Sequence, residues 1–125
     1  MSARPDASAG FYPVVSMDPA IAHAGSRERL IGANPQAARE ALYSPERNVR
    51  ADMPPLWLLH AGDDSVVKID NSLRLQATAR SVGVSCEAHY FAEGEHGFGI
   101  LKAAGLPVAI WPDLLWAWLK ARRIV

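Results

Sequence analysis

The chain has 125 residues, and its 13 Lys and Arg balance its 13 Asp and Glu, so the formal net charge is zero. This balance gives no electrostatic reason to expect nucleic acid or an anionic membrane as a partner. A single cysteine excludes an internal disulfide, and no stretch approaches the roughly 18 apolar residues of a membrane-spanning helix. The length suits one domain with a moderate core.

Three apolar runs predict the strands of this domain. The first, residues 11–17, contains aromatic and β-branched residues, although Pro13 restricts it to an edge or to a gap in the hydrogen-bond ladder. The second, residues 56–61, lies between two prolines and Gly62 and is typical of a strand buried on both faces. The third covers residues 84–92. We therefore predict an α/β fold with three parallel strands flanked by helices.

Four helices are predicted between and after these strands. Ser26 is the expected N-cap of a helix that ends at Gly32, and Asn34 is the expected N-cap of the next. A longer helix begins near Ile69 and ends at Gly83, which makes residues 56–92 a right-handed crossover unit. Asp113 is the expected cap of a final amphipathic helix.

Polar side chains follow two of the predicted strands at their carboxyl ends. Asp63 and Asp64 come after residues 56–61, and His96 follows residues 84–92 between glycines. Functional groups gather at this edge of a parallel sheet. A carboxylate bonded to one ring nitrogen fixes the imidazole tautomer and leaves the other nitrogen free as a base. A lone Asp or His is more often structural, but their joint placement predicts an acid–base pair.

Two motifs carry a resemblance to a known family. Residues 60–67, His-Ala-Gly-Asp-Asp-Ser-Val-Val, and residues 94–99, Gly-Glu-His-Gly-Phe-Gly, resemble the C-terminal part of α/β-hydrolase esterases. The acetyl-esterase/lipase-like branch, which includes acetylxylan esterases, is the most similar group. The resemblance implies that Asp64 is the catalytic acid and His96 the catalytic histidine. Lys68 stands where this family usually has proline, and Glu95 replaces a small residue.

The resemblance implies a serine hydrolase that acts on short-acyl esters or acetylated carbohydrates, without a cofactor or metal. Its serine lies in a G-x-S-x-G motif, and the 125 residues contain no such motif. Ser8 is the nearest candidate, but Asp6 replaces the first glycine, so we do not expect Ser8 to be the nucleophile. We therefore expect residues 1–125 to form a single partial α/β-hydrolase domain that lacks the nucleophile and oxyanion loop.

Two alternatives to this interpretation remain open. A non-catalytic interaction module on a degenerate scaffold predicts that Asp64 and His96 lie apart. One half of a split hydrolase predicts a serine supplied by another chain. A partial domain also predicts an exposed sheet edge and self-association. His60 is expected to be packed or bonded to backbone, and Cys86 to be a small core residue.

Overall fold

The structure, a computed structural model, describes residues 3–125. Its three strands form one parallel sheet in the order β1-β2-β3, with Ser8 paired to Leu56 and Leu56 to Cys86. The elements, in chain order, are β1 (Ser8–Phe11), α1 (Ala24–Ile31), α2 (Ala37–Leu42), the 3-10 helix η1 (Pro45–Arg47), β2 (Leu56–Ala61), α3 (Asp70–Ser81), β3 (Cys86–Phe91), the 3-10 helix η2 (Pro107–Ile110) and α4 (Trp111–Ala121).

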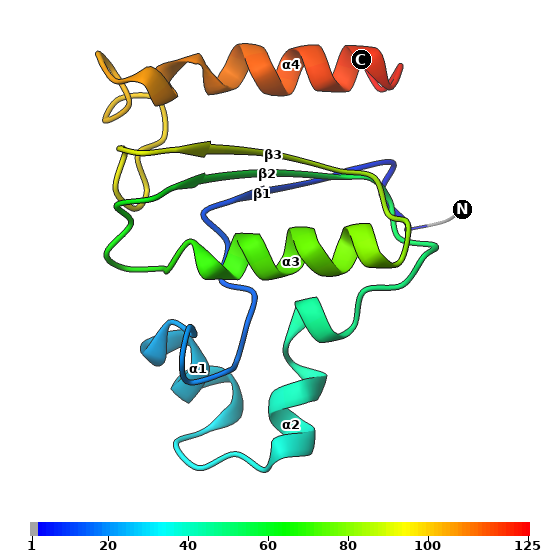
Figure 1. Cartoon of the computed structure of the whole chain (residues 1–125), viewed down its shortest axis with the longest axis vertical. Helices are drawn as coiled ribbons and strands as arrows, with labels where there is room; N and C mark the ends of the chain where they lie inside the picture. Colours follow the sequence, from blue (N-terminus) through cyan, green and yellow to red (C-terminus); the bar gives the residue numbers. More distant parts are fainter. Residues whose placement is uncertain (1–2) are drawn as a thin grey trace.

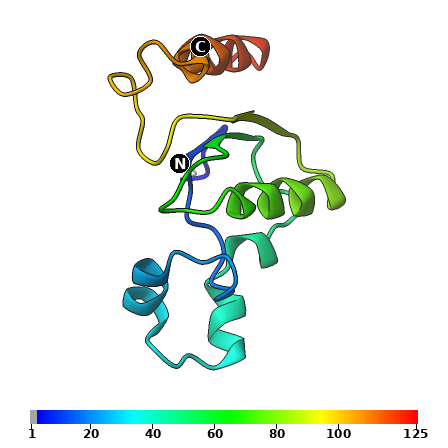
Figure 2. The same cartoon turned by 60° about the vertical axis from the view of Figure 1, so that its left-hand side comes forward.

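Helices cover both faces of the sheet. Figure 1 shows α4 on one face and α3 on the other, with α1 and α2 beyond α3, and the turned view in Figure 2 shows the same layers. Side chains of β2 alternate between these faces, as the period of a strand requires. Trp57 and Leu59 join the core under α4, whereas Leu56 and Leu58 join the core under α3. The predicted three-stranded parallel α/β fold is confirmed.

The predicted boundaries of the first strand are wrong. The strand is Ser8–Phe11, and only Phe11 of the predicted run 11–17 belongs to it. Tyr12 donates the last ladder bond to Leu59 O at 2.7 Å, and its φ of 38° then turns the chain away from the sheet. Pro13 has no N–H to continue the ladder. The rest of the apolar run is buried by leaving the sheet and packing beside α3, where Val15 joins the core.

The buried segment after β1 is held by one side chain of α3. The Oδ1 atom of Asn71 accepts hydrogen bonds from the backbone amides of Val15 and Ser16, at 3.0 and 2.9 Å. Its Nδ2 atom donates to the carbonyls of Ile21 and Lys68, at 2.9 and 3.0 Å. Asn71 is fully buried, so all of its polar atoms are paired inside the protein, as a buried amide requires.

Two of the predicted helix caps are replaced by other residues. Helix α1 begins at Ala24, and Nδ1 of His23 accepts from the amide of Ser26 at 3.2 Å, so His23 is the cap. Helix α2 begins at Ala37 because the first helical acceptor is the carbonyl of Gln36, not that of Asn34.

The final helix also starts earlier than its sequence signal. Helix α4 begins at Trp111 because η2 runs directly into it, which leaves Asp113 in the first turn rather than at the cap. The third helix ends near Gly83, whose φ is 82°, as predicted. None of the helices formed by residues 3–125 is long and apolar enough to cross a membrane.

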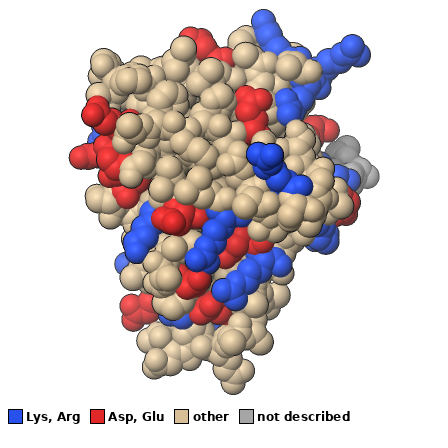
Figure 3. Space-filling view, viewed as in Figure 1, with Lys and Arg blue, Asp and Glu red and all other residues tan. Residues whose placement is uncertain are grey.

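Charged side chains tie the segment that carries α1 and α2 together. Glu40 pairs with Arg27 at 3.2 Å and with Arg47 at 3.3 Å, and Asp18 pairs with Arg74 at 2.7 Å. Figure 3 shows acidic and basic side chains interleaved across the middle of the face that it draws, below an uncharged area that has charged side chains around its edge. Charges of both signs are therefore mixed and paired there, and they form no single-sign surface.

Candidate active site

The structure brings Asp64 and His96 into direct contact. The Oδ2 atom of Asp64 lies 2.8 Å from Nδ1 of His96. Asp64 follows β2 and His96 follows β3, so the contact depends on the pairing of these two neighbouring strands. The Asp64 side chain is fully buried, whereas the His96 side chain is 31 % exposed. One ring nitrogen of His96 is therefore held by a carboxylate, and Nε2 remains available for chemistry.

The carboxylate of Asp64 is held in its charged form by hydrogen bonds. Its Oδ1 atom accepts from the amides of Val66 and Val67, at 2.9 and 2.8 Å, in a turn closed by the side chain itself. Burial alone raises the pKa of Asp64, but the amide of Val67, the ring of His96 and the amide of Val66 together lower the pKa below its ordinary value. A buried, ionised carboxylate suits the role of orienting an imidazole and stabilising an imidazolium.

The loop that carries His96 has an unusual backbone. Gly97 has a φ of 68°, which glycine adopts without steric cost, and Glu95 has a φ of 57° despite its side chain. A Cβ atom at Gly94 would lie 3.1 Å from Cβ of Ala61 and 3.1 Å from the ring of Phe98. Glycine at 94 therefore lets the loop approach the end of β2, and this places the imidazole beside Asp64.

Asp63 fixes the same loop by its backbone. Its two carboxylate oxygens accept from the amides of Gly94 and Glu95, at 3.2 and 2.8 Å. The two neighbouring carboxylates thus have different partners, because Asp64 holds the ring of His96 and Asp63 holds the chain before it. The sequence drew attention to Asp63 only as a neighbour of Asp64, and nothing in its local pattern identified the contact with the loop.

Aromatic rings form the wall of the site next to β1. The ring of Tyr12 lies edge-on to that of His96 with 4.9 Å between centroids, and edge-on to that of Phe98 with 5.1 Å between centroids. Phe98 is buried in the core under α4. The turn after β1 therefore packs against His96, a contact that the expected strand over residues 11–17 did not include.

His60 contacts Asp64 from the interior of the protein. It is fully buried, and its Nε2 atom lies 2.9 Å from the carbonyl oxygen of Val67 and 3.2 Å from Oδ2 of Asp64. Its Nδ1 atom lies 2.8 Å from Oγ of Ser72 in α3. His60 was expected to be packed or bonded to backbone, and it is both, but its contact with Asp64 was not anticipated. The only sequence signal for this contact was that His60 and Asp64 are four residues apart at the end of β2.

Ser8 lies at the opposite end of the sheet. It begins β1 and pairs with Leu56, the first residue of β2, whereas Asp64 and His96 follow the last residues of β2 and β3. Five strand steps of about 3.3 Å each separate these ends, or about 16 Å. Ser8 therefore cannot reach His96. Within residues 3–125, no group of three or more His, Cys, Asp or Glu side chains is arranged to hold a metal ion.

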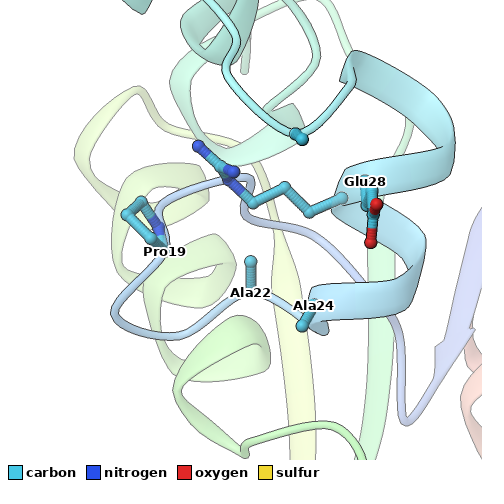
Figure 4. A pocket seen from close by; sticks show the side chains of 6 residues that line it. Pro19, Ala22, Ala24 and Glu28 are labelled. Carbon is cyan, nitrogen blue, oxygen red and sulfur yellow. The ribbon is translucent and has the colours of Figure 1, made fainter.

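Two surface pockets differ in their relation to the site. One, of about 290 Å³, lies at the start of α1, and its lining includes neither Asp64 nor His96. Figure 4 shows Pro19, Ala22, Ala24 and Glu28 around it. The other, of about 660 Å³, borders the loop that carries His96. Its lining residues are Asp63, Glu93, Gly94, Glu95, Lys102 and Leu106.

The sequence is similar to parts of two longer proteins, an acetylxylan esterase and a xylanase. The acetylxylan esterase of Xylanibacter ruminicola is 32 % identical over 100 residues, which cover 77 % of this chain and 21 % of that protein. The endo-1,4-beta-xylanase B of Butyrivibrio fibrisolvens is 31 % identical over 100 residues, which cover 80 % of this chain and 16 % of that protein. The chain thus spans about a fifth of the first relative and about a sixth of the second. No protein-family model matches the sequence.

Solved structures give the same relationship. The acetyl ester-xyloside bifunctional hydrolase of Caldicellulosiruptor lactoaceticus superimposes with a TM-score of 0.88 and 36 % identity, over 94 % of this chain and 43 % of that one. A sugar hydrolase of Lactococcus lactis gives a TM-score of 0.74 and 28 % identity, over 95 % of this chain and 49 % of that one. The fold and these matches define the chain as an α/β hydrolase. Within that class, it corresponds to the C-terminal part of the acetyl-esterase-like members.

Proposed function

We propose that this chain supplies the acid and the base of a Ser-His-Asp triad in a carboxylic-ester hydrolase. The 2.8 Å contact between Oδ2 of Asp64 and Nδ1 of His96 carries the proposal. In this mechanism, Nε2 of His96 takes the proton of a serine hydroxyl and later returns it to the leaving alcohol. Asp64 holds the ring in the required tautomer and stabilises its protonated form. The non-catalytic alternative predicted that Asp64 and His96 lie apart, and the 2.8 Å contact disagrees with that prediction.

We propose short-acyl esters, including acetylated carbohydrates, as the substrates. Two matches with at least 30 % identity support this class of substrate. One is named as an acetylxylan esterase and the other as an acetyl ester-xyloside bifunctional hydrolase. The proposal assigns the nucleophile and the oxyanion hole to residues outside these 125, since the sequence contains no G-x-S-x-G and Ser8 lies at the far end of the sheet. A second chain that carries the serine fits the same geometry.

A chimera tests the proposed triad. The part of the Caldicellulosiruptor lactoaceticus hydrolase that precedes the matched region is joined to this chain, and hydrolysis of an aryl acetate is measured. We expect the chimera to be active and Asp64→Asn to lower its kcat by about 10⁴-fold, because the amide stabilises the wrong tautomer of the imidazole. Asp52→Asn, the same change at an exposed carboxylate paired with Arg50, should leave kcat unchanged.

Two results would contradict the proposal. One is an Asp64→Asn chimera as active as its parent. The other is ester hydrolysis by the 125-residue chain alone that Ser8→Ala abolishes, because this would make Ser8 the nucleophile.

We also propose that β1 is a docking edge for another strand. The amides of Ser8 and Tyr12 donate to Pro55 and Leu59 of the β2 side, so the alternate amide of Ala9 points away from the sheet. Ala9 is exposed. In the chain alone, we expect this edge to pair with a second copy.

Sedimentation analysis tests the pairing of β1. Ala9→Pro removes the outward N–H without removing a bond to β2, and should shift the chain toward monomer. Ala9→Thr keeps the N–H and serves as the control. Equal association of the parent and both variants would exclude this edge as the contact.

A further inference from the structure

We infer that His60 and Ser72 form a positioning pair that fixes the Asp64 carboxylate for His96, an inference that rests on the proposed triad. The alternation of β2 places the side chain of His60 on the face covered by α3, opposite to Leu59 and Ala61. There it lies between Ser72 of α3 and the turn that follows β2. His60 and Ser72 are both fully buried, so their polar atoms depend on partners inside the protein.

The hydrogen bonds of His60 determine where its proton lies. The carbonyl oxygen of Val67, 2.9 Å from Nε2, can only accept, so Nε2 carries a hydrogen. In the neutral ring, Nδ1 then accepts a hydrogen bond from the hydroxyl of Ser72, across 2.8 Å. The carbonyl of Val67 thereby selects the tautomer of His60, and Ser72, whose hydroxyl can donate or accept, supplies the hydrogen bond that the other ring nitrogen needs.

This tautomer acts on Asp64 in two ways. The Nε2–H of His60 holds the carbonyl of Val67, while the amide of Val67 donates to Oδ1 of Asp64 at 2.8 Å. His60 therefore fixes the peptide segment that binds the carboxylate. In addition, Nε2 lies 3.2 Å from Oδ2, the oxygen that contacts His96. The partly positive hydrogen on Nε2 of His60 thus lies beside the negative charge of Asp64, whose side chain has no access to water.

Few other groups can perform this role. Asp64 contacts the amides of Val66 and Val67, the ring of His96, and the ring of His60. The neighbouring carboxylate of Asp63 is turned toward the loop amides instead. Among residues 3–125, His60 is thus a fully buried side chain that contacts the same carboxylate oxygen as the partly exposed His96.

The experiment separates positioning from packing by two substitutions at one site. The pKa of Asp64 is measured from the pH dependence of its carboxyl carbon resonance in the labelled 125-residue chain. His60→Leu removes the N–H, and we expect the pKa of Asp64 to rise by roughly 0.5 to 1 unit, the scale on which a polar contact shifts a carboxyl group. His60→Gln places an amide N–H near the position of Nε2 and should restore a value close to that of the parent.

A matched histidine on the next strand provides the control. His89 lies on β3, pairs in register with Leu59 and contacts Glu87 rather than Asp64. His89→Leu should leave the pKa of Asp64 unchanged. If His60→Leu leaves that pKa at the parent value, or if His60→Gln raises it as much as His60→Leu, the positioning role is overturned.

Ser72→Ala decides the matter if His60→Leu does not fold. This variant keeps the ring of His60 but removes its Nδ1 partner. We expect the nitrogen chemical shift of His60 Nδ1 to change, because that atom loses its hydrogen-bond partner, and the pKa of Asp64 to rise in part, because the ring is held less firmly. Unchanged shifts and an unchanged pKa would overturn the inference.

These measurements need no ester and no serine. A rise in the pKa of Asp64 in a chain whose chimera hydrolyses nothing would leave the contact standing and remove the proposed function. If the chimera is active but neither His60→Leu nor Ser72→Ala changes the pKa of Asp64, the proposed function stands and the positioning role of His60 and Ser72 is overturned.

Discussion

The loop that carries His96 and the segment that follows β1 are both irregular, yet they are held in different ways. The loop is fixed by two charged carboxylates from the turn after β2, Asp63 at its backbone and Asp64 at its histidine. The segment after β1 is fixed by a neutral, fully buried amide, Asn71. The first arrangement leaves His96 partly exposed, whereas the second seals Val15 and Ser16 from water.

This difference separates a segment built for chemistry from one built for burial. A charged anchor orients an imidazole and stabilises its protonated form, which a neutral amide does less well. A neutral amide pairs buried backbone groups without the desolvation cost of an isolated charge. Substitution of Asn71 should therefore lower the free energy of unfolding by a different amount from substitution of Asp63.

Removal of the buried anchor should have the largest effect on stability. Asn71→Ala removes the side-chain partner of two buried backbone amides and of the carbonyl of Ile21, and we expect the free energy of unfolding to fall by roughly 3–5 kcal/mol. Urea denaturation measures this loss. Asn48→Ala removes an exposed asparagine that also bonds three carbonyls, and it should cost about 1 kcal/mol. Equal losses for the two variants would erase the distinction between the segments.

Removal of the backbone anchor of the His96 loop should cost less. In Asp63→Ala, the exposed amide of Glu95 turns to water and the part-buried amide of Gly94 loses a longer bond of 3.2 Å, so the free energy of unfolding should fall by about 1–2 kcal/mol. Amide hydrogen exchange should nevertheless become faster at Glu95 than in Asp52→Ala, a change at another exposed carboxylate. Unchanged exchange at Glu95 would show that Asp63 does not hold the loop.

A change in the backbone conformation of the His96 loop, at Glu95, should have the smallest effect on the free energy of unfolding. Glu95 adopts a φ of 57°, a conformation that costs a side-chain-bearing residue about 1 kcal/mol. Glu95→Gly removes this cost but increases the entropy of the unfolded chain, so we expect a net stabilisation of about 0.5 kcal/mol. Glu93→Gly, at a residue without positive φ, should destabilise instead. Thermal denaturation of both variants compares them, and destabilisation by Glu95→Gly would show that the loop is not strained there.

Local patterns predicted the parts of the fold whose signals are short-range. The buried strand β2, the helix α3 that ends near Gly83, and the parallel crossover to β3 all follow from apolar runs and glycines. The glycines around His96 likewise indicated a histidine loop at a strand end. The expected first strand failed because a turn at Tyr12 and a distant hydrogen-bond partner, Asn71, decide where the apolar run leaves the sheet.

The sequence by itself determined the residue types, the order of Asp64 before His96, and their places after consecutive strands. Only the tertiary structure decided that the two side chains meet at 2.8 Å and that His60 and Ser72 lie behind the carboxylate. The physical reason is the range of the interactions. Turns, caps and strand periods act over a few residues, whereas the register of β2 against β3 and the packing of α3 join residues far apart in the chain.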